Sequence, residues 1–382
     1  METISLLFIF EERNVNLILD TEKIGFSEAL CAVTIVMAAH LILLLPKYLI
    51  QSQGSASLIN VIYITIISLL AIFTFNRLYK NFKGKDILDI SKFLLGNHFR
   101  FIIGIIYIVY LLFVVSLCLR ITAENLKSMY FHNTPTIFLL FFLLLAIGYV
   151  NRYGFKTVIK CNLIILPLIF IASAFLFALS IPNFTFERIF PILGNGFQNT
   201  FLTGAFNTFC FSNILLLFFM MPYLKEYHQF SKLSYASILL SGALLFAAIA
   251  AIVLLFPISI SSGSNIPIYL QSRSISFGKL FQRIDTFFVL IWILCVLSYG
   301  SIILSFMVSI FCKIAHIETR RHISSTFTAI IFGFSMLYTN VVQARQFDFK
   351  GYRILSLSIA WWLGFLILIL SNIKMKRKKY KC

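Results

Sequence analysis

Ten stretches of this sequence come close to the length and hydrophobicity needed to cross a lipid bilayer, and this feature constrains the fold most strongly. A membrane-spanning helix needs about 20 mostly apolar residues, because hydrocarbon solvates neither charges nor free backbone groups. The stretches are residues 27–49, 58–75, 101–119, 136–150, 158–179, 201–221, 238–256, 287–310, 323–342 and 354–370. We therefore predict an all-α integral membrane protein with ten transmembrane helices, called here the first to the tenth span.

The composition excludes several classes of protein. Hydrophobic residues make up 60% of the 382-residue chain and charged residues only 12%, whereas a soluble domain carries roughly 25% charged residues. A soluble enzyme, a disordered chain and a nucleic-acid-binding protein are therefore excluded. The seven cysteines are scattered without a CxxC pair, so the sequence predicts no disulfide framework, no metal site and no cofactor.

The net charge of +18 fits the topology of a membrane protein. If the N-terminus is cytoplasmic, 22 of the 32 Lys and Arg residues lie in or beside the segments on the cytoplasmic side, as the positive-inside rule requires. Nine or eleven spans would place the two termini on opposite sides. We predict a cytoplasmic segment 1–24, a single membrane domain 25–373 and a basic cytoplasmic tail 374–382, in a multi-pass protein of the cell membrane.

The first and sixth spans end alike, which indicates an internal repeat. Pro46 and Pro222 each close an apolar run, and a lysine and a tyrosine follow each of them. In transporters built from two inverted repeats, the corresponding helices are interrupted near the bilayer midplane and hold the substrate there. We predict two inverted five-helix repeats in which the first and sixth spans are interrupted.

Small and polar residues precede these two prolines, and polar groups in a membrane have to face the interior of the bundle. We expect a ligand cavity between the interrupted parts of the first and sixth spans, completed by the third and eighth. Its predicted walls are Met37, Ala39, His40, Tyr107, Tyr110, Asn207, Thr208, Ser212, Asn213, Ser298 and Tyr299. The alternative is that these residues only pack helices together through small side chains and interhelical hydrogen bonds.

Charged residues mark the outer ends of two spans. Arg120 and Glu124 close the third span four residues apart, on one helical face. Arg283 and Asp285 open the eighth span two residues apart, so each needs another partner. We expect all four, together with the two prolines above, to serve structure or subunit contact. No Asp or Glu lies deep in a predicted span, which argues against an ion-coupling cycle based on carboxylates.

Two connections have predicted features of their own. The segment 86–98 between the second and third spans places apolar residues at helical spacing. We expect it to lie along the cytoplasmic interface rather than to cross the membrane. The outer loop 259–279 is rich in Ser and Ile, and we expect it to be the longest irregular connection.

Six short motifs, in this order, resemble those of one protein family. They are Leu45-Pro46, Arg120 with Glu124, Thr134-Pro135, Pro191 to Gly196, Phe211 to Pro222, and Arg283 with Asp285 and Trp292. The chain from about Gly25 to Lys379 resembles the permease-type spore germination proteins. These are the membrane B subunits of nutrient germinant receptors and belong to the amino acid–polyamine–organocation superfamily.

The sequence departs from the family pattern at two places. Ala39, His40 and Leu41 stand where the family has glycines, which allow an unwound backbone at little steric cost. Asn213, and Leu215 or Leu216, stand where the sixth span of the family commonly has a Gly and a Glu. The missing glutamate removes an ion or ammonium contact, and the bulkier first span favours a small or planar ligand.

The resemblance implies recognition of a small nutrient germinant, typically an amino acid, in the spore inner membrane, which triggers germination. The implied partners are the A and C subunits of the receptor, the germinant and membrane lipids, but not nucleic acid. Two alternatives stay open, an ion-coupled amino acid transporter of the same fold and an ion-conducting channel subunit of the receptor. An enzyme is not expected, because no Ser/His/Asp cluster, HExxH or GxSxG motif lies at membrane depth.

Overall fold

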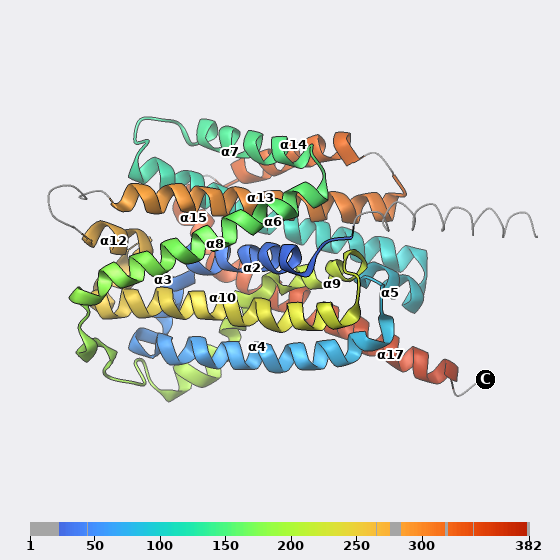
Figure 1. The fold of residues 1–382 in the computed structure, drawn as a ribbon, viewed down its shortest axis with the longest axis horizontal. Helices are drawn as coiled ribbons and strands as arrows, with labels where there is room; N and C mark the ends of the chain where they lie inside the picture. The colour runs from blue at the N-terminus through green and yellow to red at the C-terminus, as the bar shows by residue number, and fades with distance from the viewer. Residues whose placement is uncertain are drawn as a thin grey trace, which may run out of the picture.

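The structure is a bundle of helices that run along one long axis (Figure 1). This computed structural model describes residues 23–43, 45–264, 266–275, 284–317, 320–338 and 340–379, and the regular secondary structure of these residues is entirely helical. Arg283 and residues 1–22 of the predicted N-terminal segment lie outside the described residues, and so does the side chain of His40.

Each of the ten predicted spans coincides with helical structure in the described residues. The bounds are α2 (Phe26–Leu43) and α3 (Leu45–Gln53) for the first span, α4 (Ser57–Tyr79) for the second, α6 (Asn97–Met129) for the third, α7 (Thr136–Asn151) for the fourth, α8 (Phe155–Ser180) for the fifth, Gln198–Tyr223 for the sixth, α10 (Tyr227–Leu255) for the seventh, α13 (Ile284–Ala315) for the eighth, α14 (Arg320–Met336) for the ninth and Val341–Arg377 for the tenth. Within the described residues, seven helical stretches are by themselves long and apolar enough to cross a membrane. The chain is therefore an all-α, multi-pass membrane protein.

Three features differ from the prediction. The tenth span begins at Val341 rather than near residue 354, because polar residues in its first turns dilute the apolar pattern. It therefore includes Asp348, which is 1% exposed in the π-helix η8 (Phe347–Tyr352), and the expectation that no acid lies inside a span is wrong. The described part of the predicted outer loop is mostly helical, since it forms α11 (Ile258–Gly263) and α12 (Pro267–Ser274), while residues 265 and 276–279 lie outside the described residues.

Helix α2 lies at the centre of the bundle. Every residue from Ala32 to Ala39 is buried, as expected of a helix that is apolar on all faces. α2 packs against α8, α10, α13 and the 3-10 helix η6 (Gly204–Leu216), and Figure 1 shows it between α13 and α10. A displacement of α2 would consequently reach four neighbouring helices.

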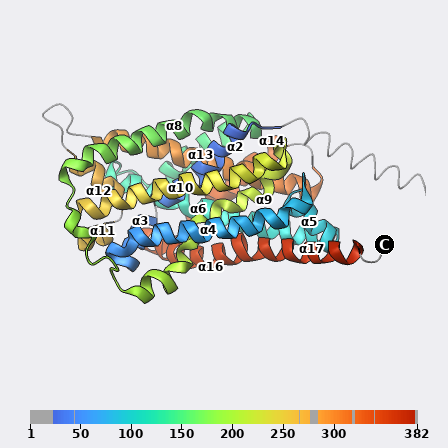
Figure 2. The same ribbon diagram turned by 60° about the horizontal axis from the view of Figure 1, so that its bottom comes forward.

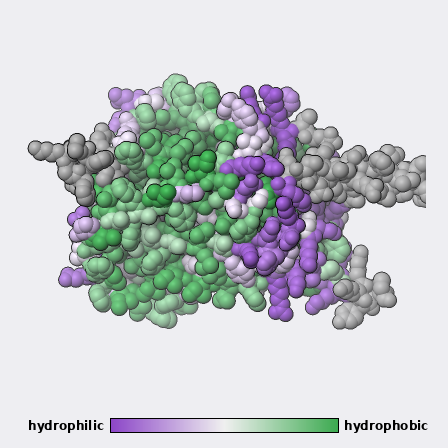
Figure 3. All heavy atoms as spheres, in the orientation of Figure 1, coloured by the Kyte–Doolittle hydropathy of each residue, from purple (hydrophilic) through white to green (hydrophobic). Residues whose placement is uncertain are grey.

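The outside of the bundle is apolar over most of its length. On α4, Ile62, Ile66, Leu70 and Phe73 recur every three or four residues, and at least half of each side chain is exposed. Figure 3 shows hydrophobic residues over the middle of the molecule and hydrophilic residues toward the end where α5 (Ile87–Leu95) lies. α4 and α17 (Gly364–Lys379) lie side by side (Figures 1 and 2), and the C-terminus is at this same polar end. Such an apolar belt faces lipid.

Helix α5 is bonded at both of its ends. Asp86 and Asp89 form a capping box at its N-terminus, in which each side chain accepts a hydrogen bond from the other residue's backbone N–H. Lys313 of α13 donates to Oδ2 of both aspartates at 2.7 Å. At the other end, Lys374 of α17 donates to two of the last carbonyl groups of α5, at 3.0 and 2.7 Å. The predicted helix between the second and third spans is confirmed, and two lysines join it to the eighth and tenth spans.

The two aspartates share one ammonium group, and their pKa values differ as a result. Burial raises the pKa of Asp86 to about 6, and the negative charge of Asp89 adds to this rise, while Lys313 opposes it. Burial also acts to raise the pKa of Asp89, but the charge and hydrogen bond of Lys313 outweigh it and leave that pKa lowered. Above the pKa of Asp86, the native state therefore depends on Lys313 to hold two carboxylates together.

We expect Lys313→Met to destabilise the protein strongly near neutral pH. The variant leaves two carboxylates without their cation, and breaking a buried ion pair in this way costs roughly 3 kcal/mol. Because Asp86 has a raised pKa, it takes up a proton in the folded state on acidification, so the loss of stability should shrink between about pH 7.5 and about pH 5. Thermal unfolding in detergent at both pH values checks this, with Lys160→Met, an exposed lysine of α8, as the control. A loss that is equal at both pH values would contradict the shared-ammonium arrangement.

Candidate functional site

The sixth span is interrupted where the predicted ligand residues lie. It consists of the π-helix η5 (Gln198–Thr203), the 3-10 helix η6, the short helix α9 (Leu217–Met220) and the 3-10 turn η7 (Met221–Tyr223). Phe211 leaves helical geometry, with φ −92° and ψ 15°. A 3-10 stretch inside a longer helix often marks a hinge. The predicted interruption is confirmed here; in the first span, α2 ends at Leu43 and α3 starts at Leu45, and residue 44 lies outside the described residues.

Asparagine amides bond the interrupted span to its neighbours. The Nδ2 of Asn213 donates to the backbone carbonyl of Val36 in α2 at 2.9 Å. The Nδ2 of Asn207 donates to Oδ1 of Asn60 in α4 at 2.9 Å, and Asn60 in turn donates to the carbonyl of Thr200 at the same distance. Because hydrocarbon offers no other partner for these groups, the bonds fix the interrupted span against the first and second spans.

The first and sixth spans also meet at the polar end of the bundle. The Nζ of Lys23 donates to the carbonyl of Pro222 at 3.0 Å, and the N–H of Ile24 donates to the carbonyl of Tyr223 at 2.9 Å. The other predicted proline, Pro46, is buried as the second residue of α3. The two spans are therefore joined both at the interruption and at the polar end.

Hydroxyl groups connect the third, sixth and tenth spans. The side chains of Ser212 and Tyr352 share a hydrogen bond of 2.6 Å, and Tyr110 donates to Oγ of Ser356 at 3.2 Å. Sequence reasoning missed both residues: Tyr352 lies before the predicted start of the tenth span at residue 354, and Ser356 lies inside that span but was not singled out as a polar residue. Their spacing of four residues, which places two hydroxyl groups on one helical face, is the signal that could have identified them.

Of the remaining predicted residues whose side chains the structure describes, Thr208 is half-buried and the others are buried, but they do not all meet. Ser298 donates to Oδ1 of Asn162 in α8, and Thr208 bonds a carbonyl of its own helix. Met37 and Ala39 are buried in α2. The hydroxyl groups of Tyr107 and Tyr299 are buried and have no hydrogen-bond partner among the described residues. A buried polar group without a partner marks a place where a water or a ligand group would be accommodated.

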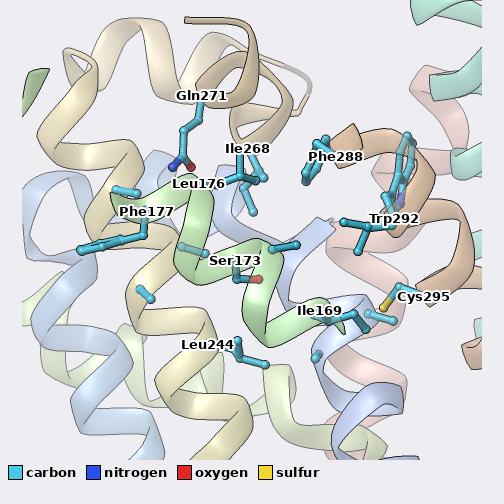
Figure 4. A pocket seen from close by; sticks show the side chains of 17 residues that line it. Ile169, Ser173, Leu176, Phe177, Leu244, Ile268, Gln271, Phe288, Trp292 and Cys295 are labelled. Atoms are coloured by element: carbon cyan, nitrogen blue, oxygen red, sulfur yellow. The ribbon is translucent and has the colours of Figure 1, made fainter. Parts of the chain in front are cut away.

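A cavity lies beside α2, and none of its lining residues belongs to the interrupted span. It has an empty volume of about 690 Å³, its mouth included, and lies between α2, α8, α10, α12 and α13 (Figure 4). Its lining residues are Ala38, Ala39, Ile169, Ala172, Ser173, Leu176, Phe177, Leu244, Ala247, Ala248, Ala251, Ile268, Gln271, Phe288, Ile291, Trp292 and Cys295. Ala39 is the one predicted ligand residue in this lining, and Tyr299 lies one helical turn beyond Cys295 on α13.

The lining of this cavity suits a compact apolar group. Six alanines leave the space open, and the aromatic residues Phe177, Phe288 and Trp292 form part of the wall. Figure 4 shows Gln271 reaching from α12 toward Leu176 and Phe177, where its Nε2 donates to Oγ of Ser180 at 3.0 Å. The Nε1 of Trp292 has no hydrogen-bond partner among the described residues. A mostly apolar cavity with a few polar groups is typical of a small-molecule site.

The charged residues at the outer ends of the spans tie helices together. Arg120 and Glu124 form an ion pair of 2.8 Å, with side chains that are 7% and 16% exposed. Oγ1 of Thr136, at the start of α7, donates to the same carboxylate of Glu124 at 3.1 Å. Asp285 of α13 accepts hydrogen bonds from Tyr130 at 3.0 Å and from Tyr269 at 3.5 Å. In the described residues, no cluster of three or more His, Cys, Asp or Glu could hold a metal ion.

Comparison with known proteins identifies relatives in one family. The model of a family described as spore germination protein matches residues 23–344. Spore germination protein B2 of Bacillus subtilis (strain 168) is 21% identical over 274 residues, which are 71% of this chain and 74% of that protein. Spore germination protein XB of Bacillus anthracis is 21% identical over 277 residues, 72% and 77% of the two chains. Spore germination protein KB of Bacillus subtilis is 21% identical over 216 residues, 56% and 57% of the two chains.

Solved structures with the same fold are membrane transporters. The crystal structure of MhsT in complex with L-phenylalanine has a TM-score of 0.67 at 16% identity and covers 91% of this chain and 89% of its own. Mhp1, a nucleobase-cation-symport-1 family transporter, has a TM-score of 0.69 at 12% identity over 91% and 78% of the two chains. A Na⁺-coupled sialic acid symporter has a TM-score of 0.65 at 12% identity over 92% and 78%. The relatives are named as spore germination proteins, two of these solved structures are named as a transporter and a symporter, and none is named as an enzyme.

We expect Arg120→Ala to lower the amount of folded protein. It leaves the carboxylate of Glu124 largely buried beside Thr136 without its cation, at a cost of roughly 3 kcal/mol. Protein level in the membrane and the thermal unfolding midpoint measure the effect. Arg152→Ala, which removes an exposed arginine after α7, is the control, and Glu124→Gln in the Arg120→Ala background should recover part of the loss. A normal protein level with a selective loss of ligand response would instead place the pair in the binding site.

Proposed function

Because the chain belongs to the spore germination protein family, we propose that it is the membrane subunit of a nutrient germinant receptor, which recognises a small germinant and triggers germination. One observation carries this proposal. Helix α2 contributes Ala38 and Ala39 to the lining of an apolar cavity, and its Val36 accepts a hydrogen bond from Asn213 of the interrupted sixth span. A ligand in the cavity would therefore touch the same helix that holds the hinge of the sixth span.

The chemistry of the site favours an amino acid with an apolar side chain. The apolar part would occupy the cavity among the alanines and aromatic residues. Its polar groups would lie toward the predicted ligand residues, where Ser298 and Tyr299 continue α13 beyond Cys295 and the hydroxyl group of Tyr299 has no partner among the described residues. Free backbone groups at a helix interruption supply further donors and acceptors for a carboxylate and an ammonium.

Binding would act through a two-state bundle. A ligand that presses on Ala38 and Ala39 would shift α2 and, through the bond between Val36 and Asn213, the interrupted sixth span. The part of that span near Phe218 is bonded to Tyr79. The single hydroxyl proton of Tyr79 faces two acceptors, the carbonyl of Phe218 at 3.2 Å and that of Lys85 at 2.7 Å. Lys85 directly precedes the capping box of α5, so the signal would reach the polar end of the bundle.

The family also guides the proposed setting of the protein. We place it in the inner membrane of the spore with both termini in the cytoplasm, because the basic tail and α5 lie at the same polar end (Figure 3). The membrane domain 25–373 would consist of two inverted five-helix repeats. The A and C subunits of the receptor would be its partners and would receive the signal.

We expect Ala39→Leu and Asn213→Ala each to shift the germinant concentration needed for half-maximal germination. Ala39→Leu fills the cavity, and Asn213→Ala removes the bond from the sixth span to α2. Overpacking or the loss of such a bond is worth roughly 1 kcal/mol, which corresponds to a shift of about fivefold. Ile171→Phe adds bulk to an exposed position of α8 and should leave the dose response unchanged. An unaltered response in both site variants at normal protein level would contradict the site.

An ion-coupled amino acid transporter is the second candidate, and the fold of the structural neighbours supports it. Proteoliposomes that contain the purified chain distinguish the two. A receptor subunit should bind germinant without accumulating labelled amino acid, whether or not a Na⁺ or proton gradient is present. Accumulation that requires such a gradient would assign transport, and an ionic current that germinant switches on would assign a channel.

A further inference from the structure

A second cavity lies at the polar end of the bundle, between the start of α6 and the end of α13. It is lined by Asn97, His98, Arg100, Phe101, Ile102, Ile314 and His316 and has an empty volume of about 630 Å³, its open mouth included. Its lining combines basic, imidazole and amide side chains with the apolar side chains of Phe101, Ile102 and Ile314. No step of the proposed germinant response uses these residues.

The basic side chain at the base of this cavity is held in place. Arg100 is 7% exposed, and its Nη2 lies 2.7 Å from Nε2 of His316. A guanidinium group only donates hydrogen bonds, so the imidazole accepts here and carries its proton on Nδ1. His316 adopts a positive φ of 55° as α13 ends. This backbone conformation places the side chain of His316 beside that of Arg100, which lies 216 residues earlier in the sequence.

The two aspartates of α5 form their ion pairs with a lysine and not with Arg100. The carboxylates of Asp86 and Asp89 both bond Lys313, which lies one turn before His316 on α13. An exposed imidazole, that of His98, and an exposed amide, that of Asn97, complete the polar lining. Planar guanidinium groups pair strongly with phosphate oxygens, and imidazole and amide groups donate further hydrogen bonds.

An apolar track leads away from the cavity along α6. Phe101, Ile102, Ile105 and Val109 are between 37% and 56% exposed and lie on one side of the helix. They point into the lipid belt and start directly at the polar lining. A free phosphate or a polar soluble metabolite has no apolar chain that could contact this track, whereas the acyl chain of a lipid would cover it.

We propose that this cavity binds the phosphate-bearing headgroup of an anionic phospholipid, whose acyl chain lies along Phe101, Ile102, Ile105 and Val109. Basic pockets beside transmembrane helices on the cytoplasmic side are suited to such headgroups. The site joins the start of α6 to the end of α13, about one turn beyond Lys313, which bonds the N-terminus of α5. A bound lipid would therefore stabilise the contact between the third and eighth spans.

The test uses the purified full-length protein in detergent, titrated with dioleoyl phosphatidylglycerol or dioleoyl phosphatidylcholine. We expect the anionic lipid to raise the thermal unfolding midpoint more than the zwitterionic lipid does. Arg100→Gln should weaken the apparent affinity for phosphatidylglycerol about fivefold, the factor for roughly 1 kcal/mol per basic side chain. Phe101→Ser should weaken it as well. Each variant is compared with its own midpoint in phosphatidylcholine, so a loss of folding stability does not count as a loss of binding.

Two controls separate the possible outcomes. Lys160→Gln removes an exposed lysine of α8 outside the cavity and should keep the full preference for phosphatidylglycerol. Inorganic phosphate and glycerol 3-phosphate should not reproduce the stabilisation. If either soluble phosphate stabilises the protein as well as the lipid does, and Phe101→Ser has no effect, the ligand is a free phosphate and the lipid proposal is overturned. An unchanged preference in Arg100→Gln would overturn the site itself.

Discussion

The absence of water inside a membrane is the constraint on which this structure depends. A helix that leaves regular geometry, as the sixth span does at Phe211, frees polar backbone groups that lipid cannot solvate. The interruption is therefore surrounded by protein. The amide groups of Asn207 and Asn213 bond the sixth span to its neighbours, and Asn60 of the second span bonds back to it. Gly204 shows how close this packing is, because a Cβ there would collide with Nδ2 of Asn60, which donates to the carbonyl of Thr200.

This constraint also explains the position of α2. A helix that is apolar on all faces from Ala32 to Ala39 and carries small side chains can be enclosed by the fifth, sixth, seventh and eighth spans and still leave space beside it. The alanines at 38 and 39 line that space, while the backbone carbonyl of Val36 accepts a hydrogen bond from Asn213. The cavity and the bond to the interrupted span therefore involve the same short stretch of α2.

At the polar end, charges replace apolar packing as the means of joining helices. Lys313, Lys374 and Lys23 each reach an acid or a carbonyl group of another segment. These contacts fix α5 relative to the eighth and tenth spans, and the start of the first span relative to the end of the sixth. Because the groups lie at the boundary with water, protonation and lipid headgroups have access to them. Changes in the membrane-embedded part can therefore be passed to the polar end of the bundle.

The sequence by itself determined the membrane class, the helical segments at the predicted spans, the interruption of the sixth and the pairing of Arg120 with Glu124, because each depends on local apolar length, local polar spacing or an i,i+4 relation. It also placed Ser212 and Asn213 at the interruption. Only the tertiary structure decided that the cavity lies beside α2, that Tyr352 and Ser356 join the polar network, and that Arg100 meets His316. Periodicity tells which face of a helix is buried but not which neighbour that face meets, and such contacts between distant residues follow from the packing of the whole bundle.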